Sequence, residues 1–257
     1  PLIPPEMREN TGEIEAARDG DLPDLIEEEE IRGDLHTHTE WSDGDTTVEA
    51  MAMGAAERGY DYLAIGDHAE GPGVFGNTGL SPDEIREQMP VVEEARDALA
   101  EVGHDLELLH GIETNVTADG GLSTPDDLLA ELDVVVASPH AALDQDRETA
   151  TERLVDAIEH PQTDVLGHPT GRLINQRPGL SPDFERLAEA AAEAGTALEL
   201  NANPSRLDLP AEAVRIAVEA GATIAINTDA HRPGALSESR YGVHTARRGW
   251  AETDDVL

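Results

Sequence analysis

Residues 33–38 read Gly33-Asp34-Leu35-His36-Thr37-His38, a short segment with strand character that sets the pattern for the rest of the chain. Helical stretches rich in Ala, Glu and Arg separate this segment from the further apolar runs. We expect strands near 33–38, 61–67, 106–113, 133–138, 164–167, 197–201 and 223–228. Strand starts that recur every ~30 residues are typical of βα units in a parallel sheet. With no Gly-rich dinucleotide motif, the pattern favours a closed α/β barrel over an open sheet.

The helical patterns fall near 46–58, 82–102, 125–131, 147–159, 182–194 and 210–220. Residues 1–30 differ from the rest, because they are polar, acidic and rich in proline. We therefore expect an acidic N-terminal extension or linker over 1–30, with one short helix around Glu13 to Ala17, and one folded domain over 31–257. The first residue is Pro1 rather than Met, so we expect a fragment or a processed chain.

Acidic residues dominate the composition of the chain. It has 257 residues with 55 Asp and Glu, 17 basic residues that are all Arg, and a formal charge of −38. Such a chain resembles the proteins of salt-in halophiles, since carboxylates stay hydrated at molar salt, where the Debye length falls to ~3 Å. The acidity is therefore explained first by a saline habitat, and it is not by itself evidence for a particular function.

Composition also excludes several classes of protein. The chain has no cysteine, so disulfides, thiolate metal sites and a cysteine nucleophile are excluded. No apolar run approaches the ~20 residues of a membrane helix, and the N-terminus lacks the features of a signal peptide. We expect a soluble, cytoplasmic protein with no membrane partner.

Histidine and acidic residues gather at the C-terminal ends of the predicted strands. Because the strand ends of a barrel form one rim, residues far apart in the sequence should meet there in one pocket. The set contains six of the ten histidines and three acids: His36, His38, Asp43, His68, Glu113, His140, His168, Asp229 and His231.

This set predicts a metal site. The i, i+2 spacing of His36 and His38 on a strand points both imidazoles to one face. One such histidine alone is more often a hydrogen-bonded structural residue. Burying nine ionisable groups together without cations, however, would cost more than the net stability of a domain. Nitrogen and oxygen ligands without sulfur suit Mn²⁺, Zn²⁺ or Fe²⁺.

The ordered motifs His36-x-His38-Thr, Ser42-Asp-Gly, Gly66-Asp-His, Gly111-x-Glu, Ser138-Pro-His, Gly167-His-Pro and Thr228-Asp-Ala-His resemble the polymerase and histidinol phosphatase (PHP) domain family. The resemblance spans about residues 31–249 and implies a distorted (β/α)7 TIM-like barrel with a trinuclear metal site at the strand C-terminal rim. It implies three divalent transition-metal ions. Mn²⁺ is the first choice, and Zn²⁺ and Fe²⁺ are the alternatives. The implied ligands are His36, His38, Glu113 and Asp229 for the first, Glu113, His140 and His168 for the second, and Asp43, His68 and His231 for the third.

Further segments resemble the PHP domains of bacterial and archaeal family X DNA polymerases. These are Ile3-Pro-Pro-Glu-Met-Arg with Gly12-Glu-Ile-Glu-Ala-Ala, Gly167-His-Pro-Thr-Gly-Arg-Leu, Asn201-Ala-Asn-Pro-Ser-Arg-Leu-Asp-Leu and Ala246-Arg-Arg-Gly-Trp. Nothing in the chain supplies the nucleotidyl-transfer carboxylates or the helix-hairpin-helix loops of a polymerase. The resemblance thus implies a polymerase domain upstream or in trans.

The resemblance implies a metal-dependent phosphoesterase, with catalytic roles for Glu113, Asp229 and His231. The leading hypothesis is a 3′→5′ exonuclease or 3′-end phosphodiesterase that acts on DNA 3′ ends in repair. The alternatives are a phosphomonoesterase that acts on small phosphate esters, such as a histidinol-phosphate phosphatase, and a non-catalytic metal-stabilised scaffold for a polymerase. Four rim arginines are candidates for contacts to phosphate oxygens: Arg172, Arg177, Arg206 and Arg232. The acidity of the chain weighs against DNA, whose binding usually requires a basic face.

Overall fold

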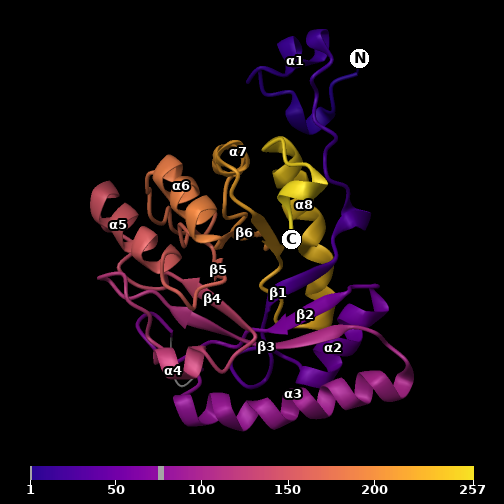
Figure 1. Ribbon diagram of the computed structural model, residues 1–257, viewed down its shortest axis with the longest axis vertical. Helices are drawn as coiled ribbons and strands as arrows, with labels where there is room; N and C mark the ends of the chain where they lie inside the picture. The colour runs from indigo at the N-terminus through magenta and orange to yellow at the C-terminus, as the bar shows by residue number, and fades with distance from the viewer. Residues whose placement is uncertain (1, 75–77) are drawn as a thin grey trace.

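Seven parallel strands, in the order β1 to β7, form the centre of the molecule in the computed structural model, which describes residues 2–74 and 78–257 (Figure 1). The strands are β1 Gly33–Thr37, β2 Tyr62–Ile65, β3 Glu107–Asn115, β4 Val134–Ser138, β5 Val165–Leu166, β6 Ala197–Asn201 and β7 Ile224–Asn227. β1 and β7 meet through the parallel bridge between Thr37 and Ala230, where the His38 backbone N–H donates to the Ala230 carbonyl at 2.8 Å. The expected α/β barrel is confirmed, and it is nearly closed.

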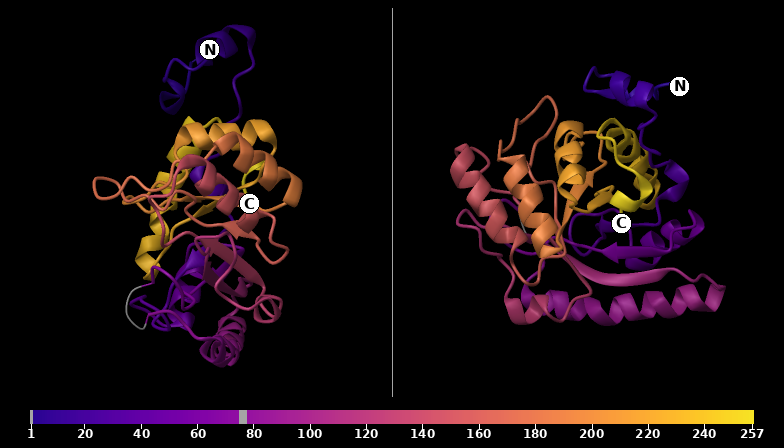
Figure 2. Two further views of the ribbon diagram at one scale, coloured as in Figure 1. Left: turned by 90° about the vertical axis from the view of Figure 1, so that its left-hand side faces the viewer. Right: turned by 45° about the horizontal axis from the view of Figure 1, so that its top comes forward.

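Helices follow the strands and cover the outside of the sheet. They are α2 Val48–Glu57, α3 Pro82–Val102, α4 Asp126–Leu129, α5 Arg147–Ile158, α6 Phe184–Ala194, α7 Ala211–Ala220 and α8 Ser239–Arg248. α5, α6 and α7 pack in sequence beside β4 to β7, while the long α3 packs against α2 and β3 (Figures 1 and 2). Each helix that the sequence predicts is present within a few residues of its expected bounds.

Local signals in the sequence explain where several helices begin and end. The Ser81 hydroxyl accepts a hydrogen bond from the Glu84 N–H, and the Glu84 carboxylate accepts one from the Ser81 N–H, so α3 begins with a capping box. Thr47 caps α2 with a single hydrogen bond, which its hydroxyl accepts from the N–H of Ala50. Gly103 ends α3 with a φ of 82°, a conformation that favours glycine.

Alternating side chains divide each strand between the barrel interior and the helices. In β2, Leu63 and Ile65 belong to the large apolar cluster that includes helix residues, whereas Ala64 belongs to a second cluster. The second cluster draws on β2 and on β4 to β7: Ala64, Val134, Val136, Val165, Ala197 and Ala225. Small and β-branched side chains therefore fill the middle of the barrel, and the polar side chains lie beyond them at the strand ends.

A β-bulge in β1 aims the first two histidines. The register with β2 shifts between Asp34 and Thr37. Leu35 therefore packs against the interior cluster, while His36 also faces inward and contacts Glu113. A bulge inserts one residue and so lets two consecutive side chains point to one side. His36 and His38 do share a face, as the sequence predicts, with ring centroids 5.0 Å apart.

Helix α8 is the one main helix that the sequence pattern did not predict. Its segment has few apolar residues and contains Gly242, which usually weakens a helix. The structure explains this glycine, since a Cβ there would lie 2.6 Å from Ile226 and 2.9 Å from Ala202. α8 can approach β6 and β7 closely because this position has no side chain.

The N-terminal residues contact the same helix. They contain the 3₁₀ helices Pro5–Met7 and Glu28–Glu30 and the helix α1 Glu13–Asp19, which matches the short helix that the sequence predicts. Met7 is fully buried, and the Glu6 carboxylate lies 3.1 Å from the Arg247 guanidinium of α8. The division of the chain at residue 30 stays a prediction. Two further 3₁₀ helices, Pro233–Glu238 and Thr253–Asp255, flank α8.

No helix among the described residues is long and apolar enough to cross a membrane.

Candidate metal centre

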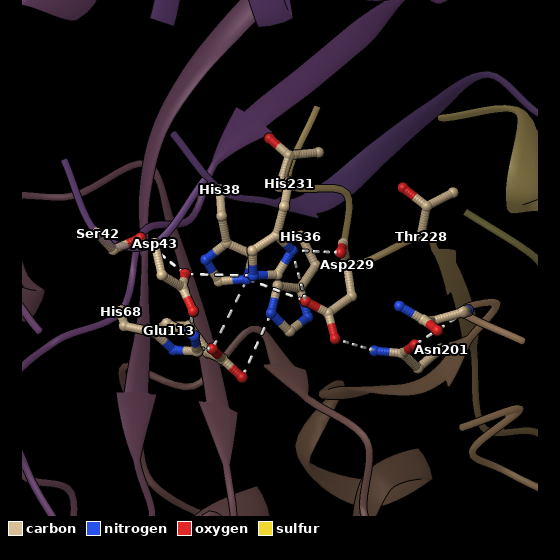
Figure 3. Close-up of polar contacts among 12 residues, drawn as sticks. His36, His38, Ser42, Asp43, His68, Glu113, Asn201, Thr228, Asp229 and His231 are labelled. Carbon is tan, nitrogen blue, oxygen red and sulfur yellow. Dashed lines mark hydrogen bonds and ion pairs between the residues drawn. The ribbon is translucent and has the colours of Figure 1, made fainter. Parts of the chain in front are cut away.

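The Glu113 side chain lies at the middle of the predicted rim. It projects from β3 and is completely buried. Its Oε1 lies 3.3 Å from His36 Nε2, 3.2 Å from His140 Nε2 and 3.0 Å from His168 Nε2. Its Oε2 lies 2.5 Å from His68 Nδ1. Four histidines from four strand ends thus lie within 3.3 Å of one carboxylate, and His38 Nε2 lies 3.8 Å from its Oε2. Figure 3 shows Glu113 with His36, His38 and His68.

The remaining predicted ligands extend the cluster toward β7 and the loop after β1. His38 Nε2 lies 3.1 Å from Asp229 Oδ1. His231 Nε2 lies 3.2 Å from Asp43 Oδ1, and His68 Nε2 lies 3.6 Å from the same oxygen. The structure therefore brings all nine predicted ligands together, and Figure 3 shows them except for His140 and His168.

Three groups in the cluster have ligand atoms within 4.8 Å of one another. They are His38, Asp43, His68 and His231; His36, His38 and Asp229; and His68, Glu113 and His140. These groups overlap the three ligand sets implied by the family resemblance, but they share His38 and His68 between neighbouring sites. His168 lies outside the groups, although its Nε2 contacts Glu113.

Unpaired polar atoms show that the residues fit metal ions. Both oxygens of Glu113 and ring nitrogens of five histidines are buried with no hydrogen-bond partner: His36, His38, His68, His140 and His168. Burying such atoms without a partner costs ~1–3 kcal/mol each. Divalent cations held by imidazole and carboxylate would remove this cost, and these donors suit Mn²⁺, Zn²⁺ or Fe²⁺.

Two of the predicted ligands have strained backbones. His168 has a φ of 22° and Asp229 a φ of 54°, in the left-handed region that non-glycine residues rarely adopt. Each such residue costs ~1–3 kcal/mol unless the surroundings impose it, and such strain clusters at functional sites. Both residues follow strand ends, where the turn directs their side chains back over the barrel.

A second layer of polar groups orients the ligands. Glu199 of β6 accepts hydrogen bonds from His36 Nδ1 at 2.7 Å and from the His168 N–H at 2.6 Å. Asn115 Oδ1 lies 2.8 Å from His140 Nδ1. The two ring contacts leave Nε2 of His36 and Nε2 of His140 facing Glu113, which is how second-layer groups fix the orientation of metal-binding imidazoles, whereas the His168 contact is made by its backbone N–H.

Sequence reasoning missed these supporting residues. Glu199 lies between Leu198 and Leu200 in a buried strand, and Asn201 follows it on the same face. A carboxylate inside an apolar strand, with a polar residue two positions later, was the signal that could have identified it.

Hydrogen bonds to Asp67 hold the loop that carries Asp43 in place. This buried carboxylate accepts hydrogen bonds from the Thr39 N–H and hydroxyl, at 2.7 and 2.6 Å. It also accepts from the Ser42 hydroxyl at 2.5 Å and from Gln88 Nε2 of α3 at 2.7 Å. Asp67 therefore ties the β1 loop to α3, next to the predicted ligand His68.

Electrostatics in the cluster favour ionised carboxylates. Burial opposes charge on Glu113, but His140, His36 and His68 hold its pKa well below the usual value. Burial likewise opposes charge on His36, but Glu199 and Glu113 raise its pKa well above the usual value. Burial lowers the pKa of His168 to about 4, so this imidazole is neutral and free to bind a cation.

The four candidate arginines lie in different settings. Arg177 and Arg206 line a pocket of about 340 Å³ together with Asp43, His68 and His140. Arg206 Nε lies 3.1 Å from Asp229 Oδ2, and its Nη1 is buried without a partner. Arg172 donates to the carbonyls of Arg206 and Leu207, and Arg232 is exposed outside the pocket lining.

A larger cavity of about 650 Å³ lies at the amino ends of the strands and contains none of the nine predicted ligands.

Known proteins resemble the chain in sequence. The family model for the PHP domain matches residues 34–203. The DNA polymerase/3′-5′ exonuclease PolX of Bacillus subtilis is 42% identical over 257 residues, which is 100% of this chain and 44% of that protein. The chain therefore spans less than half the length of that relative. A protein named "Probable phosphatase" from Caldanaerobacter subterraneus is 31% identical over 216 residues, which cover 77% of this chain and 75% of that protein.

The fold also resembles solved structures. The histidinol phosphate phosphatase of Lactococcus lactis, solved with zinc, L-histidinol and phosphate, superposes with a TM-score of 0.56 at 15% identity. That match covers 84% of this chain and 93% of the other. At this identity the similarity supports the barrel architecture and nothing finer.

Proposed function

The chain belongs to the PHP domain family, and on that premise we propose that it is a metal-dependent phosphoesterase that removes nucleotides from the 3′ end of DNA. The assignment as a metal-dependent phosphoesterase is supported by the family match, the PolX relative and the similarity to a probable phosphatase. The observation that carries it is the convergence of four histidines on buried Glu113.

We assign the nine converging side chains to divalent metals. His36, His38, Glu113 and Asp229 would hold one ion, and Glu113, His140 and His168 a second. Asp43, His68 and His231 would hold a third. Bound ions supply Lewis acidity, which activates water at neutral pH and neutralises charge on a phosphate ester. Mn²⁺ is the metal that we propose, with Zn²⁺ or Fe²⁺ as alternatives, since the donors are nitrogen and oxygen.

The chain's own residues then bind and orient the substrate. Glu113 and Asp229 are ionised, because surrounding imidazoles and, for Asp229, Arg206 hold their pKa values low against the effect of burial. Arg206 and Arg177 line the pocket beside the predicted ligands, and we propose that they contact a phosphate there through Arg206 Nη1, which has no other partner, and through the Arg177 N–H groups that the Gly171 carbonyl does not accept. Asn201 Nδ2 lies 3.2 Å from Asp229 Oδ2 and helps to fix that carboxylate. His231 lines the open side of the cluster, next to Asp43.

The preference for DNA rests on the PolX relative, which is named a DNA polymerase/3′-5′ exonuclease, and on its alignment with the whole of this chain. We propose that a polymerase domain acts with this domain, either in the same protein or in trans. A second candidate is a phosphomonoesterase, which the similarity to a probable phosphatase favours.

A direct comparison of substrates tests the proposal. In molar salt with Mn²⁺, the protein should shorten a 5′-labelled DNA strand from its 3′ end. Glu113→Gln should abolish the reaction because this carboxylate contacts five of the predicted ligands. The matched change Glu107→Gln, at the exposed start of β3, should leave the rate unchanged. Turnover of histidinol phosphate and p-nitrophenyl phosphate without any DNA shortening would establish the second candidate instead.

A further inference from the structure

The loops around the metal centre differ sharply in charge. Those that follow β1 to β4, residues 38–47, 66–81, 116–125 and 139–146, carry eight acidic residues and no arginine. On the other side of the rim, the segments 165–182, 200–207 and 230–237 carry four arginines and no acidic residue. In a chain with 55 acidic residues among 257, three acid-free segments side by side are a marked local exception.

The acids that border these segments do not restore negative charge at the rim. Asp183 caps α6 and pairs with Arg147. Glu199, Asp208 and Asp229 are buried, and Glu238 is half-buried at the end of a 3₁₀ helix. Among the described residues, Arg172, Arg177 and Arg232 form no ion pair with a carboxylate, and Arg206 pairs with Asp229 inside the cluster. The rim from β5 to β7 is therefore its cationic side.

Two of these segments form one unit. The Ile174 N–H donates to the Ser205 carbonyl at 2.7 Å, and Arg172 Nε donates to the Arg206 carbonyl at 2.8 Å. Leu173 and Arg177 pair as a small antiparallel bridge. The result is a braced loop that reaches the metal pocket through Leu173 and Arg177. Residues 172–178 also line a second hollow of about 340 Å³ beyond that pocket.

We infer that this acid-free side, residues 165–182 with 200–207, is the track along which a single nucleic-acid strand leaves the metal centre. The inference rests on the proposed function. A small monoester needs cationic groups at one phosphate, whereas a strand places further phosphates outside the pocket. On a molecule with a charge of −38, those phosphates can lie close to the protein where acidic side chains are absent. The exposed side chain of Ile174, beside Arg172 and Arg177, offers an apolar contact for a base.

Charge changes at Gln176 test the track. This exposed residue lies next to Arg177 but outside the lining of the metal pocket. Two substrates are compared: a 5′-labelled single-stranded oligonucleotide and thymidine 5′-(p-nitrophenyl phosphate), a diester with one phosphate. The readout is the ratio of their kcat/KM values, at the lowest salt at which the wild type keeps its circular dichroism spectrum. Gln176→Glu should lower the ratio roughly fivefold, the size of one close exposed charge contact, and Gln176→Arg should raise it.

The same two changes at Gln162 are the matched control. Gln162 lies between α5 and β5, at the opposite end of the barrel from the metal centre, so its variants should keep the wild-type ratio. A wild type that degrades DNA, with equal ratios for the Gln176 and Gln162 variants, would overturn the track but leave the proposed function standing. A wild type that hydrolyses neither diester would instead refute the proposed function.

Discussion

Nδ1 of His36 lies 2.7 Å from Oε1 of Glu199, and both side chains are completely buried. Glu199 receives three further hydrogen bonds, from the His168 N–H at 2.6 Å, Asn227 Nδ2 at 2.9 Å and Asn201 Nδ2 at 3.3 Å. All four partners donate, so the site requires a carboxylate with two accepting oxygens. This one side chain therefore orients His36 and the turn that carries His168.

We expect Glu199→Gln to weaken metal binding by ~10- to 100-fold, the usual effect of removing a group that orients a metal-binding histidine. The new side-chain amide could be placed in two orientations, and in each its NH₂ group would face a hydrogen-bond donor. This follows because both oxygens of Glu199 accept hydrogen bonds. Titration of the metal-free protein with Mn²⁺, followed by calorimetry, measures the change. A loss of thermal stability with unchanged metal affinity would show that Glu199 has a purely structural role.

Acid should destabilise the fold through His110. This histidine is buried in β3, and its Nε2 lies 3.0 Å from Gln88 Oε1. Burial lowers its pKa to about 4. The unfolded chain binds this proton near pH 6.5 and the folded chain does not, so the contribution of His110 is complete above pH 6.5 and disappears as the pH falls toward 4.

In a His110→Gln variant, we expect the free energy of unfolding to fall less than in the wild type between pH 7 and pH 4. The difference should be on the order of 3 kcal/mol for a shift of this size. Urea unfolding at several pH values measures it, and the comparison removes the titrations that both proteins share. Parallel curves for the two proteins would contradict the account of His110.

Salt should stabilise this chain more than it stabilises an ordinary protein. With a charge of −38, repulsion between carboxylates is unscreened over ~30 Å at 0.01 M salt and screened within ~3 Å at 1 M. We expect the melting midpoint, followed by circular dichroism, to rise steeply between tens of millimolar and molar salt. Sucrose, which does not screen charge, should give a smaller rise, and a midpoint independent of salt would contradict the halophile hypothesis.

The sequence predicted the barrel and the ligand cluster because both depend on local signals. Every strand except β6 ends in a short ligand motif such as Gly66-Asp-His or Ser138-Pro-His, and a barrel brings such ends together without further information. The seven strands and the main helices up to α7 lie where the apolar periodicity predicts them.

Features that depend on contacts between distant segments were not predictable in this way. Gly242 looks unfavourable in a helix until Ile226 and Ala202 are seen against it. Glu199 looks misplaced in an apolar strand until His36 and the His168 N–H are seen to need its oxygens. The burial of Met7 likewise depends on a surface of the folded barrel that no local pattern reveals.

The central claim is that nine side chains around Glu113 form one metal centre, and its most direct test is the metal content of the protein. After loading with Mn²⁺ and removal of free ions, elemental analysis should find up to three ions per chain. Glu113→Gln should lose at least two of them, because we assign this carboxylate to two sites, while Glu107→Gln should keep the wild-type content. Wild-type protein that is folded but holds no transition metal after loading with Mn²⁺ or Zn²⁺ would contradict the claim.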